Sequence, residues 1–225
     1  MNIKNFGLGR IIVNDNNDKK YPMSSVLPKT INNTYKYWWT NGWWGDQGNT
    51  PMCVAYSWNH WLADGPITQL NSRKKTKYPF NINKLYTEAQ KVDEWPGENY
   101  NGTSVRAGAK ILKKYGYIKN YYWAWDIETT INAILTIGPV VVGTHWYYNM
   151  FFPDKNGVIK PTGQIVGGHA YLLDGINTKK QLIRIKNSWG RNWGHNGFAY
   201  ISFNDLSKLI SNNGEVCLAT EINVN

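Results

Sequence analysis

The order of the hydrophobic patterns constrains the fold of this chain more than any other feature. Helical spacing of apolar residues marks Cys53 to Leu62 and Ser104 to Tyr115, and a short helix is expected from Asp126 to Leu135. Strand patterns then take over, several with alternating apolar residues, at 139–144, 170–174, 182–186, 198–203 and 216–224. Helices followed by antiparallel strands predict an α+β protein with two lobes.

The length of the chain permits a large core. With 225 residues, 42% of them hydrophobic, it can form one large domain or two lobes around a shared interface. Residues 1–26 are polar and are expected to form an N-terminal extension fastened to the body. Residues 27–225 are expected to form the folded domain, with a helical lobe over roughly 45–125 and a β lobe over roughly 126–225 plus the N-terminal segment.

Composition also bounds the location and the partners. No run of about eighteen apolar residues exists, which argues against a membrane helix, and the first residues lack the features of a secretory signal. Two cysteines cannot build a disulfide framework or, alone, a zinc site, so a cytoplasmic location is expected, with a viral or assembly-associated one left open. The net charge of +10 leaves room for an acidic partner, but no nucleic-acid motif accompanies it.

Cys53 is the first candidate for chemistry. A cysteine beside Val54 and Ala55 is usually an inert buried thiol. Here Thr50 suits the N-cap and Pro51 suits the first helical position, which places Cys53 in the first turn of a helix. Unpaired backbone N–H groups stabilise a thiolate there, so the position favours a nucleophile.

A thiolate nucleophile needs a base, and four histidines are available. His60 lies two helical turns from Cys53 and is expected to serve the core or its rim. His195 falls in a turn and is expected to be exposed, and His145 ends a strand as a weaker candidate. His169 follows a glycine pair that ends at Gly168, which leaves its imidazole room to face a cleft, and it is therefore the preferred base.

Two amides complete the set. Asn187 stands at the end of the 182–186 strand, where its side chain could hold one nitrogen of the imidazole, with Trp189 covering that hydrogen bond. Gln47, six positions before Cys53 in a glycine-containing loop, could donate to an oxyanion together with the Cys53 N–H. Each residue alone has an ordinary structural explanation, but the ordered set predicts nucleophilic catalysis.

In these residues the chain resembles a papain-like cysteine peptidase, of a prokaryotic or viral type. The similarity runs from Leu27 nearly to the C-terminus. It is carried by Gln47 to Ser57, Asn101-Gly102-Thr103-Ser104, Lys113-Lys114-Tyr115-Gly116, Gly138-Pro139-Val140, Gly168-His169-Ala170 and, most specifically, Lys186-Asn187-Ser188-Trp189-Gly190 with Trp193-Gly194 and Gly197.

The resemblance implies a two-lobe fold, with a helical lobe, an antiparallel β-barrel-like lobe and the active site in the cleft between them. It implies that Cys53 attacks a peptide carbonyl, His169 moves the proton and Asn187 orients His169, with Gln47 in the oxyanion hole. Peptides or proteins would be the substrates, and no metal or organic cofactor is implied. The substrate cleft would include Gly102, Thr103, Gly168 and Trp189.

The sequence also departs from the family pattern. Pro51-Met52-Cys53-Val54 replaces the usual Gly-Ser-Cys-Trp, and Thr103 stands where a second glycine commonly pairs with substrate. Residues 1–26 are far shorter than the usual inhibitory prodomain. We therefore expect either that the protein is synthesised in an active form or that its activity is controlled by something other than a prodomain.

Three functions remain open from the sequence. The favoured one is a cysteine endopeptidase that works through an acyl-enzyme thioester. The alternatives are a structural or interaction protein of a larger assembly that reuses the fold, and an acyltransferase or deamidase with the same Cys-His-Asn triad. The second cysteine, Cys217, lies in an alternating strand pattern and is expected to be structural rather than a redox partner of Cys53.

Overall fold

The computed structural model describes residues 3–13, 15–38, 40, 42–65, 81–97 and 99–221. The α-helices within these residues are α1 (Cys53–Asp64), α3 (Ile82–Gln90), α4 (Val105–Lys114), α5 (Ile127–Thr136) and α6 (Phe203–Ser211). Short 3-10 helices lie at η1 (Ile3–Asn5), η2 (Asn16–Lys20), η3 (Met23–Val26) and η4 (Tyr148–Phe151). Among the described residues, no helix is long and apolar enough to cross a membrane.

The strands form one antiparallel seven-stranded sheet in the order β2-β7-β3-β4-β5-β6, with β1 pairing the far end of β4. Within the described ranges the edge strands β2 and β6 do not pair with each other. The predicted α+β class is confirmed, but the expected barrel-like lobe is an open sheet. The strands are β1 (Tyr35–Tyr37), β2 (Ile118–Ala124), β3 (Val140–Tyr147), β4 (Ile165–Asn177), β5 (Leu182–Lys186), β6 (Phe198–Ser202) and β7 (Glu215–Glu221).

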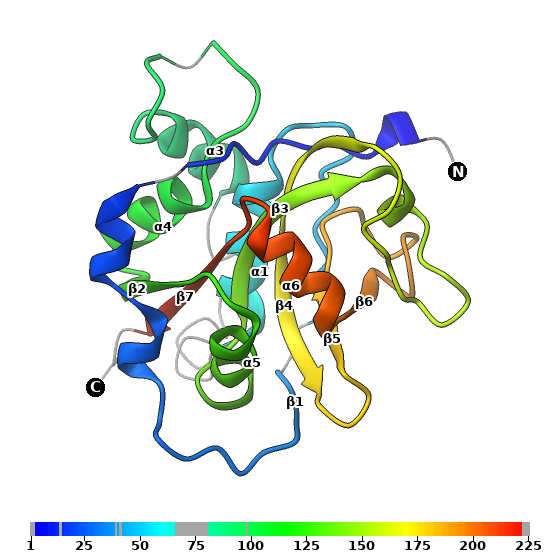
Figure 1. Cartoon of the computed structure of the whole chain (residues 1–225). Coiled ribbons are helices and arrows are strands. Elements are labelled where there is room, and N and C mark those ends of the chain that lie inside the picture. The colour runs from blue at the N-terminus through cyan, green and yellow to red at the C-terminus, as the bar shows by residue number, and fades with distance from the viewer. Residues whose placement is uncertain are drawn as a thin grey trace.

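Side-chain alternation along the central strands divides the core between the two faces of the sheet. In β3, Val140 and Val142 pack in a cluster with residues of α5 and α6. Val141, between them, packs in a second cluster with residues of α1 and α4. Successive side chains of a strand point to opposite faces of the sheet, so β3 contributes to both clusters because both faces are covered. Helices α1 and α6 lie on opposite sides of the sheet (Figure 1).

Most expected elements are present with shifted ends, and some were not predicted. The strand over 182–186 has the predicted bounds, whereas β4 is much longer than the expected 170–174. Strand β4 extends beyond its local pattern because β3 pairs with it from Ile165 to Leu173 and β5 from Leu172 to Asn177. Helices α3 and α6 were not predicted. In the structure the Ser202 hydroxyl oxygen caps α6 by accepting from the Asp205 N–H.

The start of α1 differs from the expected cap. Cys53 is its first residue, but the N-cap is Met52, which makes no side-chain hydrogen bond. The Thr50 hydroxyl instead donates to the Gln47 carbonyl oxygen at 2.7 Å. The loop before the helix is therefore closed on itself by Thr50, and this closure fixes Gln47 relative to Cys53.

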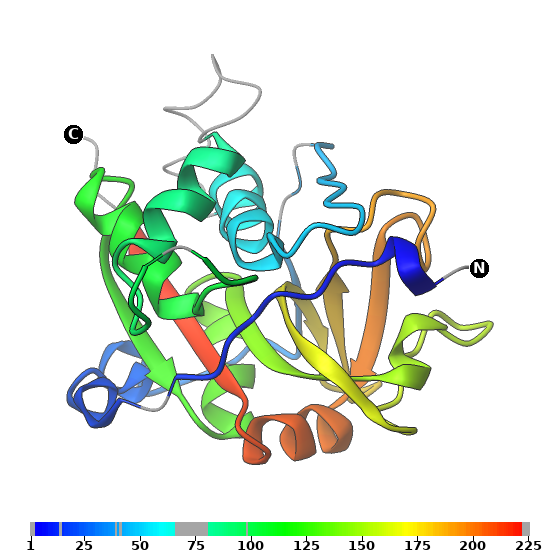
Figure 2. The same ribbon diagram turned by 90° about the horizontal axis from the view of Figure 1, so that it is seen from above.

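The N-terminal segment crosses the molecule rather than lying beside it. Residues 6–11, here called the strap, run between α1 and the strands β3 and β4, as the blue trace in Figure 2 shows. Beyond the strap the chain is fastened again, because the Arg106 guanidinium of α4 forms ion pairs with Asp15 and Asp18. The backbone N–H of Trp123 in β2 then donates to the Tyr21 carbonyl oxygen at 2.9 Å.

Candidate active site

Cys53 lies at the N-terminus of α1 with its side chain fully buried. The backbone N–H groups of Ala170 and of Gly9 in the strap approach its sulfur and favour the thiolate, but burial outweighs them and raises the pKa of the Cys53 thiol to about 11. Helix position alone therefore does not set the protonation of Cys53 in this covered state. Loss of hydration exceeds the stabilisation that the helix N-terminus provides.

His169 lies in β4 with its imidazole enclosed by aromatic rings. Trp189 stacks on it with centroids 4.5 Å apart, and Trp146 contacts it edge-on at 4.9 Å. With the Nε2–H tautomer, His169 donates to Asn187 Oδ1 at 2.8 Å. Burial lowers the pKa of His169 to about 4, so the ring is neutral near pH 7.

The orientation of the imidazole leaves Nδ1 for the chemistry. Asn187 Oδ1 also accepts from the Ser188 N–H at 2.8 Å, which fixes the oxygen of this amide toward His169. Among the described residues Nδ1 has no hydrogen-bond partner. The approach of the Ala170 N–H to the Cys53 sulfur brings that thiol beside the residue that follows His169. A direct contact between Cys53 and His169 stays a prediction.

Gln47 is buried, and both ends of its amide are in use. Its Oε1 accepts from the Ser188 hydroxyl at 2.6 Å, so its Nε2 is directed into the cleft. Nε2 donates to the Thr50 carbonyl oxygen at 2.7 Å and to the Gly7 carbonyl oxygen of the strap at 3.1 Å. Trp189 Nε1 donates to the same Gly7 oxygen at 3.3 Å, so two donors converge on a peptide carbonyl.

The strap fills the predicted substrate cleft and bonds to it as a peptide would. The Gly168 carbonyl oxygen accepts from the Gly9 N–H at 3.1 Å and from the Arg10 N–H at 3.0 Å. The Thr103 N–H donates to Gly9 O at 2.9 Å, and the Ile11 N–H donates to Thr103 O at 3.0 Å. A side chain at Gly102, whose φ is +104°, would overlap the Gly9 carbonyl.

The departure at Thr103 is accommodated by its side chain. The Thr103 hydroxyl donates to Asp93 Oδ2 at 2.8 Å and is buried, so the side chain turns away from the cleft. Its backbone N–H and carbonyl remain available to pair with the strap. A residue larger than glycine therefore fits here because Asp93 holds it aside.

The remaining histidines and the second cysteine lie outside this arrangement. His60 is buried in α1, where its Nε2 accepts from the Gly45 N–H at 3.0 Å, and burial lowers its pKa well below the usual range. His195 is exposed, as expected, and His145 is half-buried. Cys53 and Cys217 are both free and buried, so no disulfide joins them.

Sequence reasoning missed two contributors to the site. Ser188 links both amides, because its hydroxyl orients Gln47 and its backbone N–H orients Asn187. The strap itself was expected only as a polar extension. Its closely spaced Gly7 and Gly9 were the available signal, since a side chain at either would overlap the carbonyl oxygen of Thr50 or Pro51.

The fold and this site define a cysteine-dependent hydrolase scaffold, with a thiol at a helix N-terminus facing a histidine-bearing strand. The family model for papain family cysteine protease matches residues 53–217. The chain therefore belongs to the papain family of cysteine proteases.

Individual relatives are distant in sequence. A peptidase C1-like protein of Acanthamoeba polyphaga mimivirus is 26% identical over 196 residues, covering 68% of this chain and 62% of that protein. The cathepsin B-like cysteine proteinase 6 of Caenorhabditis elegans is 24% identical over 169 residues, covering 68% and 43% respectively. The chain thus spans less than two thirds of the length of both.

Solved structures share the fold over almost the whole chain. Xylellain, a cysteine protease from Xylella fastidiosa, superposes with a TM-score of 0.72 at 18% identity and covers 97% of both chains. The digestive procathepsin L2 proteinase of Tenebrio molitor gives a TM-score of 0.61 at 15% identity, covering 97% of this chain and 79% of that one. At these identities the likeness concerns the fold.

Proposed function

We propose that the protein is a cysteine endopeptidase in which Cys53 is the nucleophile, His169 the general base and acid, and Asn187 the residue that orients His169. Gln47 and the Cys53 backbone N–H supply the oxyanion hole. The family membership supports peptidase activity in general. The individual roles rest on the geometry described above.

The observation that carries the proposal is the peptide that already occupies the site. The strap presents backbone amides to the Cys53 sulfur and to Gly168, and a carbonyl to Gln47 Nε2. An extended peptide backbone therefore fits between the thiol, the oriented imidazole and the amide donor, as the binding of a peptide substrate requires.

In the proposed reaction the Cys53 proton passes to His169 Nδ1, and the thiolate attacks the carbonyl carbon of the peptide bond. The carbonyl oxygen takes the negative charge and is stabilised by Gln47 Nε2 and the Cys53 N–H. The C–N bond then breaks as His169 returns the proton to the leaving amine. Water, deprotonated by His169, hydrolyses the thioester and restores the free thiol.

The covered state is not competent for this reaction. Cys53 and His169 are both fully buried, and the strap uses the hydrogen-bonding groups that a substrate requires. A substrate can bind only after the strap leaves the cleft. The proposed enzyme is thus restrained by its own N-terminal segment.

Covalent labelling tests the proposed function. A peptidyl vinyl sulfone should modify the full chain once, at Cys53, as measured by intact mass and peptide mapping. The Cys53→Ala variant should be neither labelled nor active on a quenched fluorescent peptide library. Cys217→Ala is the matched control, since it removes the other buried thiol and should leave labelling intact.

The outcomes separate the alternative functions. A folded protein that is not labelled, and whose activity is the same in wild type and Cys53→Ala, would be a structural or interaction protein. Labelling at Cys53 with products that carry an added amine instead of a free carboxylate would identify an acyltransferase. Free carboxylates at new peptide termini would support the endopeptidase.

A further inference from the structure

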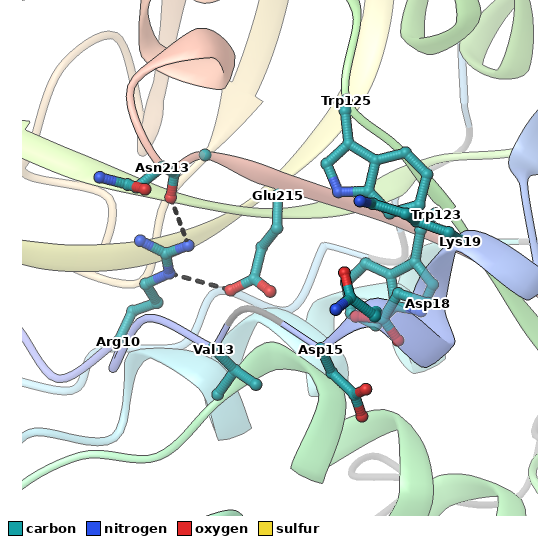
Figure 3. Close-up of a pocket in the computed structure, with 11 residues that line it drawn as sticks. Arg10, Val13, Asp15, Asp18, Lys19, Trp123, Trp125, Asn213 and Glu215 are labelled. Atoms are coloured by element: carbon teal, nitrogen blue, oxygen red, sulfur yellow. Dashed lines mark hydrogen bonds and ion pairs between the residues drawn. The ribbon is translucent and has the colours of Figure 1, made fainter.

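One strap side chain enters a pocket that the proposed chemistry does not use. Arg10 is buried, and its Nε donates to Glu215 Oε1 at 2.9 Å. Its Nη2 donates to the Asn213 carbonyl oxygen at 2.8 Å. The side chains are 1% exposed for Arg10 and 7% for Glu215, so this ion pair is shielded from solvent. Figure 3 shows the guanidinium held by both partners from the start of β7 and the turn before it.

The pocket lies at a defined register along the cleft. Thr103 pairs through its N–H with Gly9 and through its carbonyl with Ile11, so Arg10 stands directly opposite Thr103. The Gly9 N–H approaches the Cys53 sulfur. Gly9 therefore lies over the nucleophile. Arg10 is the next residue, on the side of Thr103 and away from Gln47 and Trp189. A bound peptide that pairs with Thr103 would place a side chain in the same pocket.

The pocket is shaped for a long cationic side chain. A Cβ at Gly143 of β3 would lie 2.7 Å from Arg10 Nε and 2.9 Å from Glu215 Oε1, so the glycine provides the space for both groups. A cavity of about 250 Å³, lined in part by Arg10, Trp123, Asn213 and Glu215, adjoins the guanidinium. Among the described residues, Arg10 Nη1 has no hydrogen-bond partner, so the pocket holds a planar cation without saturating it.

The buried carboxylate needs a cation. Burial raises the pKa of Glu215, and the adjacent Arg10 guanidinium opposes that rise. When the strap leaves, Glu215 loses its ion-pair partner while it remains within the cleft wall. A charged group left without a partner in a desolvated site strongly favours any ligand that restores the pair.

The strap runs parallel to the segment of Thr103, with Arg10 on the C-terminal side of Gly9. We infer that a substrate crosses the cleft in the opposite direction, and that the enzyme selects peptides with arginine at the second residue on the acyl side of the cleaved bond. Glu215 is the specificity-determining residue. This inference rests on the proposed peptidase function and names its substrate class. In this view Arg10 occupies, in the restrained state, the subsite that an arginine of the substrate occupies during turnover.

A matched pair of covalent probes tests the inference on the full chain. Acetyl-Arg-Ala-vinyl sulfone and acetyl-Leu-Ala-vinyl sulfone differ only in the side chain directed at Glu215, and the rate of Cys53 labelling by each is followed by intact mass. Both probes must displace the strap, so the extent of strap opening cancels in the ratio of their rates. We expect the arginine probe to react about tenfold faster or more, as a charge-assisted buried pair requires.

Variants assign that preference to Glu215. Glu215→Gln keeps the size and removes the charge, and should reduce the ratio to near one, while Glu215→Asp should retain part of it. Glu128→Gln, which removes an exposed carboxylate on α5, is the control and should leave the ratio unchanged. Thermal melts confirm that each variant is folded. The ratio of the two labelling rates in wild type tests the arginine preference even if a variant fails to fold.

The results distinguish the two levels of inference. Equal labelling by both probes, or faster labelling by the leucine probe, would overturn the arginine specificity and leave the peptidase function in place. An unchanged preference in folded Glu215→Gln would overturn the role of Glu215. Failure of both probes to label folded wild-type protein would remove the proposed function and, with it, the substrate class.

Discussion

At the scale of single residues, the amide of Gln47 is the group most closely tied to the transition state. Its Nε2 reaches the Gly7 carbonyl oxygen, which marks where a carbonyl can lie in the cleft, and its Oε1 is held by the Ser188 hydroxyl. A donor that strengthens its bond only as negative charge develops accelerates the reaction without tightening substrate binding.

Gln47→Ala is therefore expected to slow peptide hydrolysis by roughly a hundredfold, the usual effect of losing one oxyanion donor. Labelling of Cys53 by a vinyl sulfone should change little, because that reaction builds no carbonyl oxyanion in the hole. Steady-state kinetics and labelling rates provide the comparison. Asn187→Ala should have the milder effect on kcat, since Trp189 and Trp146 still enclose the His169 ring. A smaller decrease in kcat for Gln47→Ala than for Asn187→Ala would contradict the assignment of Gln47 as the oxyanion donor.

At the scale of elements, the strap depends on the absence of side chains at two positions. A Cβ on Gly9 would overlap the Pro51 carbonyl oxygen, and one on Gly7 would overlap that of Thr50. Both obstacles are backbone atoms of the loop before α1, which cannot move without displacing Cys53. The seating of the strap is thus sensitive to a single methyl group at either position.

Gly9→Ala is expected to unseat the strap and expose the thiol. Labelling of Cys53 at pH 7 should rise by about tenfold or more, since about 1.4 kcal/mol against the covered state already shifts the equilibrium tenfold. In wild type the labelling rate should still increase between pH 7 and pH 9, because the pKa of the covered thiol is raised to about 11. The variant should depend less on pH over this range.

Gly65→Ala is the matched control for this experiment. A Cβ there would meet Pro139 at an ordinary 3.6 Å, so the substitution should alter neither labelling nor its pH dependence. Wild-type labelling rates in Gly9→Ala would show that the strap does not limit access to Cys53.

At the scale of the whole molecule, folding buries an uncharged imidazole in the cleft. The pKa of His169 is lowered to about 4 by burial, whereas an unfolded chain binds this proton near 6.5. The unfolded state therefore takes up a proton first as the pH falls. The contribution of His169 to stability is complete above pH 6.5 and is lost as the pH falls toward 4.

Comparison with His169→Gln measures this contribution. Glutamine can still donate to Asn187 but does not titrate. Between pH 7.5 and pH 4.5 the free energy of unfolding of wild type should fall by about 2 to 3 kcal/mol more than that of the variant. Urea unfolding at both pH values provides the measurement, and other buried groups such as His60 and Glu215 cancel in the difference. An equal fall in the free energy of unfolding of wild type and variant would mean that His169 binds its proton equally in the folded and unfolded states.

Local sequence predicted those features whose causes lie close together along the chain. The alternation of Val140, Val141 and Val142 assigned a buried strand, and the helical pattern that begins at Cys53 assigned α1. The cap of α1 was predicted wrongly, because Thr50 has a nearer partner in Gln47 than in the helix. The effect of burial on the Cys53 thiol was not predicted, since helix position is visible in sequence and burial by a distant segment is not.

What the sequence alone determined is the class of fold, the family and the four residues of the proposed site, because residue types, periodicity and order carry that information. Only the tertiary structure decided what lies over the site. Arg10 meets Glu215 across 205 positions, and Gln47 meets Ser188 across 141. Such pairs arise when the sheet closes against α1 and the strap is drawn between them. Their energies come from desolvation and geometry that no local pattern encodes.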